Sequence, residues 1–243
     1  TKNEERWIGL CIERIKKQSY KNFEIILVDS FSEDKTVEKA KRNGVEKIVK
    51  IKDYKPGKAI NMGIEASKGK YIVILSAHCL PINSDWLNDL FEEINSDPKL
   101  AGVYGKQVPM DFSSNEDKRD LLIVFGEDER IQKKDSFFHN ANSIIKRDVW
   151  EENNFNNEVE NIEDRIWAGE ILKKNYKIKY TPKAPVYHYH GIHQSGNSKR
   201  LEGVTKIIEK ISTAHKPGII DHQNFEKCLV IPIKGEIPKF KNI

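Results

Sequence analysis

The chain has 243 residues, and its 41 Lys and Arg against 37 Asp and Glu give a small, evenly mixed charge that argues against nucleic acid as the main partner. It contains no run of 18 apolar residues and so no predicted membrane-spanning helix, while contact with the inner face of a membrane through basic patches stays open. Its three cysteines, Cys11, Cys79 and Cys228, lack C-x-x-C spacing, which argues against a disulfide framework and favours a cytoplasmic location.

The first 95 residues alternate between sequence patterns typical of helices and of strands. Apolar residues at helical spacing predict helices at 4–18, 36–42, 58–67 and 86–95, with Gly69 as the C-terminal cap of the third. Continuous apolar runs rich in β-branched residues predict buried strands at 23–29, 47–51 and 71–75. This alternation indicates an α/β protein with a mostly parallel sheet and helices on both faces.

The second half of the chain is less regular. We expect a polar loop at 111–120, a helix at 163–174, strands at 178–180 and 186–190, and an amphipathic helix at 200–216. The composition changes after Pro217-Gly218, so we expect one domain over residues 1–220, and a linker with the start of another domain over 221–243. The chain opens with a loop before a helix, whereas a doubly wound half normally opens with a strand, so we also expect a strand before residue 1.

Polar residues follow two of the predicted strands, where ligands of open α/β sheets bind. In VDSFSEDKT (28–36), Asp29 is placed to accept hydrogen bonds from a base or a ribose, but a turn in which Asp29 and Ser32 cap the next helix explains the pattern equally well. LSAHC (75–79) is the second polar end. The loop KPGKAINMG (55–63) enters a helix with Lys58 at its start, which suits a phosphate site and also an ordinary surface loop.

Two further clusters carry acidic or imidazole groups. Glu163 and Asp164 open a predicted helix, where the helix dipole favours carboxylates without any functional role. In VYHYHGIHQSG (186–196), His188 and His190 lie on the same face of a predicted strand, as two metal ligands would. Histidines two apart on a strand are also common as structural residues, but His193 adds a third imidazole nearby.

In their order along residues 1–215, these clusters resemble glycosyltransferase family 2, which has the Rossmann-like GT-A fold. The stretches FHNANSIIKRDVW and YGKQVP are most similar to the rhamnosyltransferase-type branch that builds bacterial surface polysaccharides. A shorter resemblance joins CLVIPIKGEIPKFKNI (228–243) to the opening of sugar-acid cytidylyltransferases, which implies that the chain is the front part of a bifunctional protein.

The family resemblance implies an inverting enzyme that moves a hexosyl or deoxyhexosyl group from a nucleotide-sugar donor to a glycan or lipid-linked glycan acceptor. It implies Asp164 as the general base, with Glu163 beside it, and places Asn140 and Asn142 toward the acceptor. The residues that it places at the nucleotide are Asp29, Ser30, Lys58, Asn61, Ser76 and Ala77. Because the base and the diphosphate loop are both present, we favour an enzyme over a non-catalytic GT-A module that binds a nucleotide sugar or a glycan.

The chain departs from the family pattern at Ser76-Ala77-His78, where an Asp-x-Asp pair usually holds a metal ion. We expect His78 to bind Mn²⁺ or Mg²⁺ there, with His188 or, as a second choice, His190 as a further ligand. With so few carboxylates, the site is expected to hold the ion weakly without the nucleotide. The alternative is a metal-free enzyme in which Lys58 and neighbouring basic groups offset the charge of the diphosphate.

Overall fold

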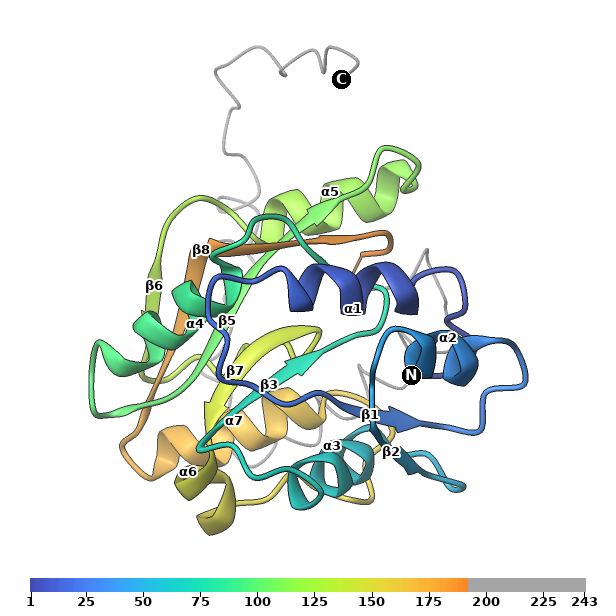
Figure 1. Ribbon diagram of the computed structural model, residues 1–243. Helices are drawn as coiled ribbons and strands as arrows, with labels where there is room; N and C mark the ends of the chain where they lie inside the picture. Colours follow the sequence, from blue (N-terminus) through green and yellow to red (C-terminus); the bar gives the residue numbers. More distant parts are fainter. Residues whose placement is uncertain (192–243) are drawn as a thin grey trace. The chain divides into compact units, whose positions relative to one another are not determined.

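The protein, described here by a computed structural model over residues 1–191, has an α/β architecture with two sheets (Figure 1). The small sheet pairs β1 (Ile26–Asp29) with β2 (Lys47–Lys50) in parallel. The large sheet has the strand order β3-β7-β5-β8-β4, and β6 joins it by pairing with β8. Its strands are β3 (Tyr71–Leu75), β4 (Leu80–Pro81), β5 (Leu100–Pro109), β6 (Arg130–Gln132), β7 (Asn142–Lys146) and β8 (Lys177–His188).

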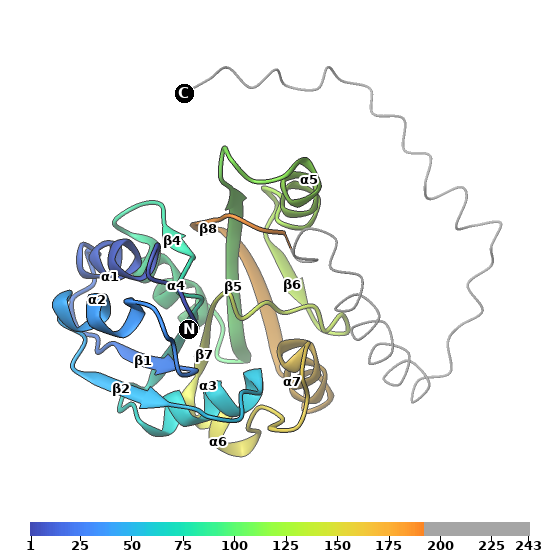
Figure 2. The same ribbon diagram turned by 90° about the vertical axis from the view of Figure 1, so that its right-hand side faces the viewer.

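Helices cover both faces of the large sheet, as the sequence predicts (Figure 2). They are α1 (Ile8–Lys16), α2 (Thr36–Arg42), α3 (Pro56–Glu65), α4 (Trp86–Asn95), α5 (Asn115–Val124), α6 (Arg147–Glu152) and α7 (Glu163–Lys173). Neighbouring residues of one strand face opposite ways: Tyr104 packs in a core cluster with α6 and α7, whereas Val103 packs in a second cluster with α4. Burial of apolar surface on both faces therefore fixes the register of these strands.

The strand pairing of the large sheet is mixed rather than mostly parallel. β5 and β8 run parallel, whereas β7 is antiparallel to both β3 and β5, and β4 and β6 are antiparallel to β8. The α/β class is confirmed, but strands and helices do not alternate regularly after β3. No helix lies between β3 and β4 or between β6 and β7, and no strand lies between α6 and α7.

Three local predictions were wrong. The expected polar loop at 111–120 contains the start of α5, where the Ser114 hydroxyl caps the helix by accepting a hydrogen bond from the Asp117 amide at 3.1 Å. The two expected strands at 178–180 and 186–190 are one long strand, β8. Gly69 does not cap α3, because that helix ends at Glu65 and its C-cap is Ala66.

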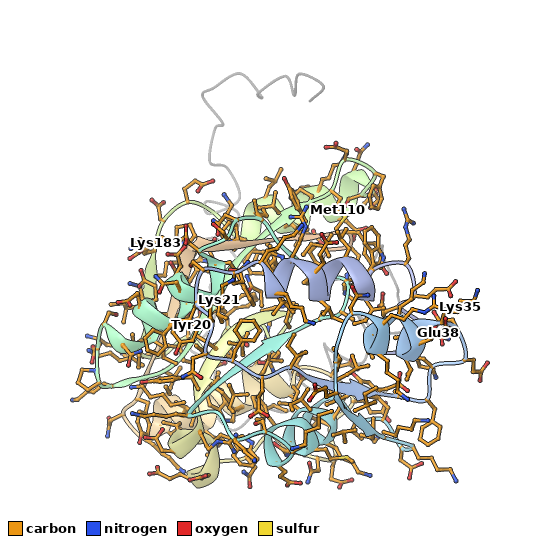
Figure 3. All side chains as sticks on the ribbon, in the orientation of Figure 1. Tyr20, Lys21, Lys35, Glu38, Met110 and Lys183 are labelled. Carbon is orange, nitrogen blue, oxygen red and sulfur yellow. The ribbon has the colours of Figure 1, made fainter. Side chains whose placement is uncertain are left out.

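Other expectations lie outside the described residues: His193, the helix at 200–216, the domain boundary near 220 and the cytidylyltransferase-like stretch at 228–243. Among the described helices, none is both long and apolar enough to cross a membrane. At α2, the charged side chains of Lys35 and Glu38 lie at the surface of the protein (Figure 3).

Candidate active site

Three histidines from distant parts of the chain meet at one end of the large sheet. His78 lies in the turn after β3, which is closed by a 2.9 Å hydrogen bond from the Cys79 amide to the Ser76 carbonyl. His188 ends β8, and His190 follows two residues later. Antiparallel pairing of Leu80 with Tyr187 brings the two segments together. One ring nitrogen from each histidine lies within 4.8 Å of those of the other two. The strand predicted at 186–190 ends at His188, so His190 reaches the cluster from the segment after β8 and not by strand alternation.

His188 has a buried ring with one nitrogen unused. Its Nδ1 lies 2.7 Å from Oε1 of Gln107, and because an amide oxygen only accepts, Nδ1 is the protonated nitrogen and Nε2 carries a lone pair. Nε2 is buried and has no hydrogen-bond partner within residues 1–191. Burial, followed by the nearby rings of His190, His78 and His139, holds the pKa of His188 well below its usual range, so the ring is neutral at pH 7.

These features fit a metal site. A buried nitrogen lone pair without a partner is costly unless something binds it, and neutral imidazole is the form that coordinates ions. His78 and His188 each have Nδ1 engaged by an oxygen acceptor, of Glu4 and Gln107 respectively, which is how ligand histidines are usually held. Imidazoles favour ions such as Zn²⁺ over Mg²⁺, while the oxygens of a donor diphosphate would add ligands suited to Mn²⁺.

A chain of polar contacts leads from the histidines to the acidic pair on α7. Gln107 on β5 contacts His188 through Oε1 and His139 Nδ1 through Nε2, the latter at 2.9 Å. The residue next to His139 is Asn140, whose backbone amide donates to Asp164 at 3.2 Å and whose side-chain amide donates to Glu163 at 3.3 Å. The predicted metal ligands and the predicted base thus belong to one continuous polar cluster.

Asp164 sits in the first turn of α7, where its carboxylate also accepts the Arg165 amide at 2.8 Å. Burial raises the pKa of Asp164 above its usual range, although these two backbone amides act in the opposite direction. The preceding residue, Ile162, has a φ of 55°, a left-handed conformation that is unusual for a β-branched side chain. Tertiary contacts therefore hold the start of α7 in place, since the N-cap Ile162 offers no side-chain hydrogen bond.

The predicted diphosphate loop lies against the segment that precedes α7. Lys58 is partly exposed in the first turn of α3. Gly57 is packed so closely that a Cβ there would lie 2.1 Å from the Asn156 carbonyl oxygen, and Lys55 forms an ion pair with Glu160 at 2.8 Å. The glycine of this loop therefore serves the packing of α3 against the approach to Asp164.

Asn61 and Asn142 are buried and heavily bonded within the protein. The Asn61 amide group donates to the Phe155 carbonyl and to Asn157, and its oxygen accepts from Trp150 Nε1 and the Phe155 amide. Asn142 accepts from Trp86 Nε1 and donates to the carbonyls of Lys106 and Ala184. Their roles toward nucleotide and acceptor stay predictions, and this bonding favours structural roles for both.

The end of β1 has the geometry of a turn. The buried Asp29 carboxylate accepts hydrogen bonds from the hydroxyl of Ser32 at 2.6 Å and from its amide at 3.2 Å. Ser30 is also buried, and its amide donates to the Thr1 carbonyl. Ser76 and Ala77 are partly exposed in the turn that carries His78. The turn expected from Asp29 and Ser32 is present, but neither residue caps α2: its N-cap is Lys35, whose side chain makes no capping hydrogen bond, and the Thr36 amide donates to Asp34 at 2.9 Å.

The comparison with protein families decides the membership of this chain. The model of the family described as glycosyl transferase family 2 matches residues 1–153, more than half of the chain. The chain belongs to glycosyl transferase family 2. This membership confirms the resemblance drawn from the sequence.

Among curated relatives, this family 2 chain is 26% identical over 192 residues to the O-antigen chain rhamnosyltransferase RfbN of Salmonella typhimurium, covering 74% of this chain and 61% of RfbN. Mannosyltransferase PcManGT from Pyrobaculum calidifontis, solved in complex with GDP-Man and Mn²⁺, shares its fold with a TM-score of 0.59 and 22% identity, covering 77% of this chain and 54% of PcManGT. S. aureus TarS 1–349 gives a TM-score of 0.60 and 18% identity, covering 78% and 58%. The chain thus spans less than two thirds of the length of these proteins, and the structural likeness confirms a GT-A glycosyltransferase fold.

Two polar residues of the family 2 site were missed in the sequence. Gln107 lies in β5, where nothing in its surroundings distinguishes a residue that orients histidine from one that faces solvent. Glu4, which contacts His78, precedes a helix, where an acidic residue is common for electrostatic reasons alone. The contacts of Gln107 and Glu4 with the histidines can be recognised only from the fold.

Proposed function

We propose that this chain is the catalytic domain of an inverting glycosyltransferase that moves a sugar from a nucleotide-sugar donor to a bacterial surface glycan. The observation that carries the proposal is the polar cluster in which His188, beside His78 and His190, is linked through Gln107 and the His139-Asn140 segment to Asp164. The similarity to an O-antigen chain rhamnosyltransferase supports the acceptor class, with a deoxyhexosyl or hexosyl group as the sugar transferred.

In the proposed reaction, an acceptor hydroxyl attacks the anomeric carbon of the donor from the face opposite the diphosphate. Asp164 takes the hydroxyl proton as the new carbon–oxygen bond forms, while the bond to the phosphate oxygen breaks and its electron pair leaves with the nucleoside diphosphate. The raised pKa of Asp164 suits this role, because a stronger base accepts the proton more readily. Asn140 holds the carboxylate in place through its backbone amide.

The residues that would hold a divalent ion are His78, His188 and His190. When bound, such an ion supplies positive charge beside the departing diphosphate. Lys58 and the amide groups at the start of α3 add to that charge, and in a metal-free enzyme they would supply it alone. The nitrogen donors of the three histidines favour the metal-dependent form.

The test is a panel of nucleotide sugars incubated with the protein and a lipid-linked glycan acceptor, with both glycan product and released nucleoside diphosphate measured. Asp164→Asn is expected to reduce product formation by about 10²-fold or more while donor affinity changes little. Asp148→Asn is the matched control, because Asp148 also lies in the first turn of a helix and accepts a backbone amide, at 2.9 Å, but is exposed on α6. Near-normal turnover by Asp164→Asn would exclude Asp164 as the base.

The second candidate is a non-catalytic module that binds a nucleotide sugar or glycan, which the absence of the Asp-x-Asp pair at Ser76-Ala77-His78 favours. Such a module would bind one donor of the panel and release no nucleoside diphosphate with any acceptor. Binding of a donor without transfer to any acceptor of the panel would therefore refute the enzymatic proposal and support the non-catalytic module.

A further inference from the structure

The carboxylate of Glu4 contacts the ring of His78. Its Oε1 lies 2.7 Å from Nδ1, and the two side chains are only 16% and 15% exposed, so water does little to weaken the contact. Because a carboxylate only accepts hydrogen bonds, Nδ1 must carry the proton. In the neutral ring, the other nitrogen, Nε2, then carries the lone pair that a metal ion requires.

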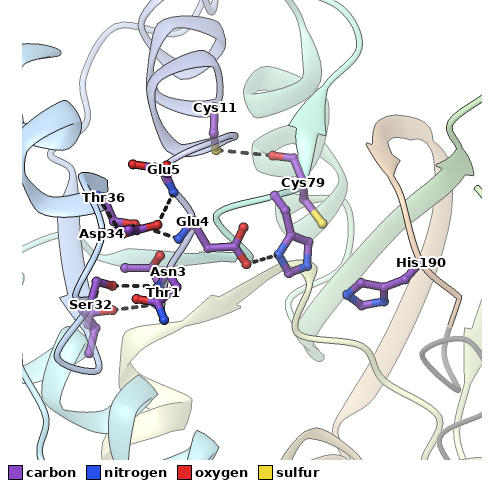
Figure 4. A network of polar contacts seen from close by, with 12 residues as sticks. Thr1, Asn3, Glu4, Glu5, Cys11, Ser32, Asp34, Thr36, Cys79 and His190 are labelled. Carbon is purple, nitrogen blue, oxygen red and sulfur yellow. Dashed lines mark hydrogen bonds and ion pairs between the residues drawn. The ribbon is translucent and has the colours of Figure 1, made fainter. Parts of the chain in front are cut away.

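Glu4 is itself held firmly, because its segment is bonded to the loop that follows β1 (Figure 4). The amides of Asn3, Glu4 and Glu5 donate to the side chains of Ser32, Thr36 and Asp34, at 2.9, 2.7 and 3.0 Å. The Glu4 carbonyl accepts from the amides of Trp7 and Ile8 at the start of α1, each at 2.9 Å. Its carboxylate therefore reaches His78 from a backbone that is fixed on both sides.

We propose that Glu4 is a positioning residue for metal binding: it fixes the tautomer and the orientation of His78, so that Nε2 faces the ion. The inference rests on the proposed metal site of His78, His188 and His190, and adds to it a residue that does not touch the ion. Gln107 plays the same part for His188, through a neutral amide instead of a carboxylate. A carboxylate behind a ligand imidazole raises its basicity as well as orienting it, so Glu4 has the larger effect on affinity.

The competing explanation is structural: the contact merely ties the N-terminal segment to the turn after β3. Glu5 separates the two explanations, because it lies in the same segment and accepts the Lys35 amide at 3.0 Å without contacting a histidine. Under the structural explanation, loss of either carboxylate would affect metal binding alike. Under the positioning explanation, only loss of Glu4 affects it.

The experiment measures the dissociation constant for Zn²⁺ by competition with a chromophoric chelator, on the full chain without any sugar donor. Glu4→Met, which removes the acceptor but keeps the volume, is expected to weaken binding about 10- to 100-fold. Glu4→Gln is expected to retain most of the affinity, since its amide oxygen still accepts from Nδ1, and Glu5→Met is expected to match the wild type.

An unchanged dissociation constant for Glu4→Met, or an equal loss for Glu4→Met and Glu5→Met, would overturn the role of Glu4 and leave the metal site standing. A wild-type protein that binds no Zn²⁺ would overturn the metal site and this inference together. A second measurement needs no variant: ¹⁵N NMR of the metal-free wild type is expected to show His78 protonated at Nδ1. A proton on Nε2 instead would refute the inference even if Glu4→Met failed to fold.

Discussion

Replacement of Asn61 by alanine separates a structural amide from one that binds the diphosphate. In the wild type, the Asn61 side chain satisfies the indole nitrogen of Trp150 at 2.8 Å and both the amide and the carbonyl of Phe155, at 3.2 and 2.8 Å. Asn61→Ala leaves these three buried groups without their partner. At about 1 to 1.5 kcal/mol for each group, the free energy of unfolding should fall by about 3 to 4.5 kcal/mol. For a protein of this size, that loss lowers the melting temperature by about 10 °C.

The assay is thermal unfolding followed by circular dichroism, paired with nucleotide titration well below the melting temperature. Asn154→Ala is the control, because the exposed Asn154 makes a single hydrogen bond, to the Trp150 carbonyl at 2.9 Å, and its loss should cost less than about 1 kcal/mol. Nucleotide affinity of the folded Asn61→Ala protein should stay within about 3-fold of the wild type, a difference of less than 1 kcal/mol. A melting temperature within 2 °C of the wild type, together with a tenfold loss of affinity, would refute this reasoning and assign Asn61 to the diphosphate.

Three further predictions address charge, metal and packing. Because burial raises the pKa of Asp164, the folded protein keeps a proton that the unfolded chain releases, so its stability falls as pH rises from about 4 through the raised pKa. Asp164→Asn lacks this titration, so its melting temperature minus that of the wild type should increase over this pH range. A difference that does not change with pH would contradict the raised pKa. Zn²⁺ at about 100 times its dissociation constant should stabilise the wild type by about 2.7 kcal/mol in thermal melts and leave His188→Ala unshifted, whereas an equal shift in both proteins would place the ion elsewhere. Gly57→Ala should lower the melting temperature by more than about 5 °C, because its Cβ would meet a backbone oxygen at 2.1 Å. Gly169→Ala on α7, whose Cβ would lie 3.8 Å from the Ser136 side chain, should raise it slightly, and similar melting temperatures for the two variants would show that the backbone before α7 moves to make room.

Elements with a strong amphipathic pattern were predictable from the sequence. The bounds of α2 and α4 agree with the predicted ranges, because α4 presents Trp86, Leu90 and Ile94 at helical spacing to one face of the sheet. By contrast, α5 begins with a polar turn, and of its apolar residues only Leu121 is fully buried, so its sequence is typical of a loop. The Ser114 cap stabilises its first turn, but a serine at this position is as typical of a loop as of a helix start.

The site was predictable in part. The meeting of His78 with His188 and His190 agrees with the expectation drawn from the family pattern. The use made of Asn61 was not predictable, since an asparagine side chain that binds phosphate and one that bridges two backbone segments have the same sequence signature. Which of these occurs depends on the position of residues 150–157, about 90 positions later in the chain, and that position is a property of the tertiary structure alone.

The position of His188 on β8 has a consequence for the order of folding. β8 pairs in parallel with β5, from Leu100 opposite Lys177 to Pro109 opposite His188, and such long-range pairing forms slowly. His188 can join His78 only once this strand has docked, so an ion held by these histidines would bind late in folding, and we expect it to bind after the rate-limiting barrier. Chelation should then leave the refolding rate unchanged while the unfolding rate increases. In a cell, metal supply would thus set the lifetime of the folded chain rather than the speed of its synthesis-coupled folding.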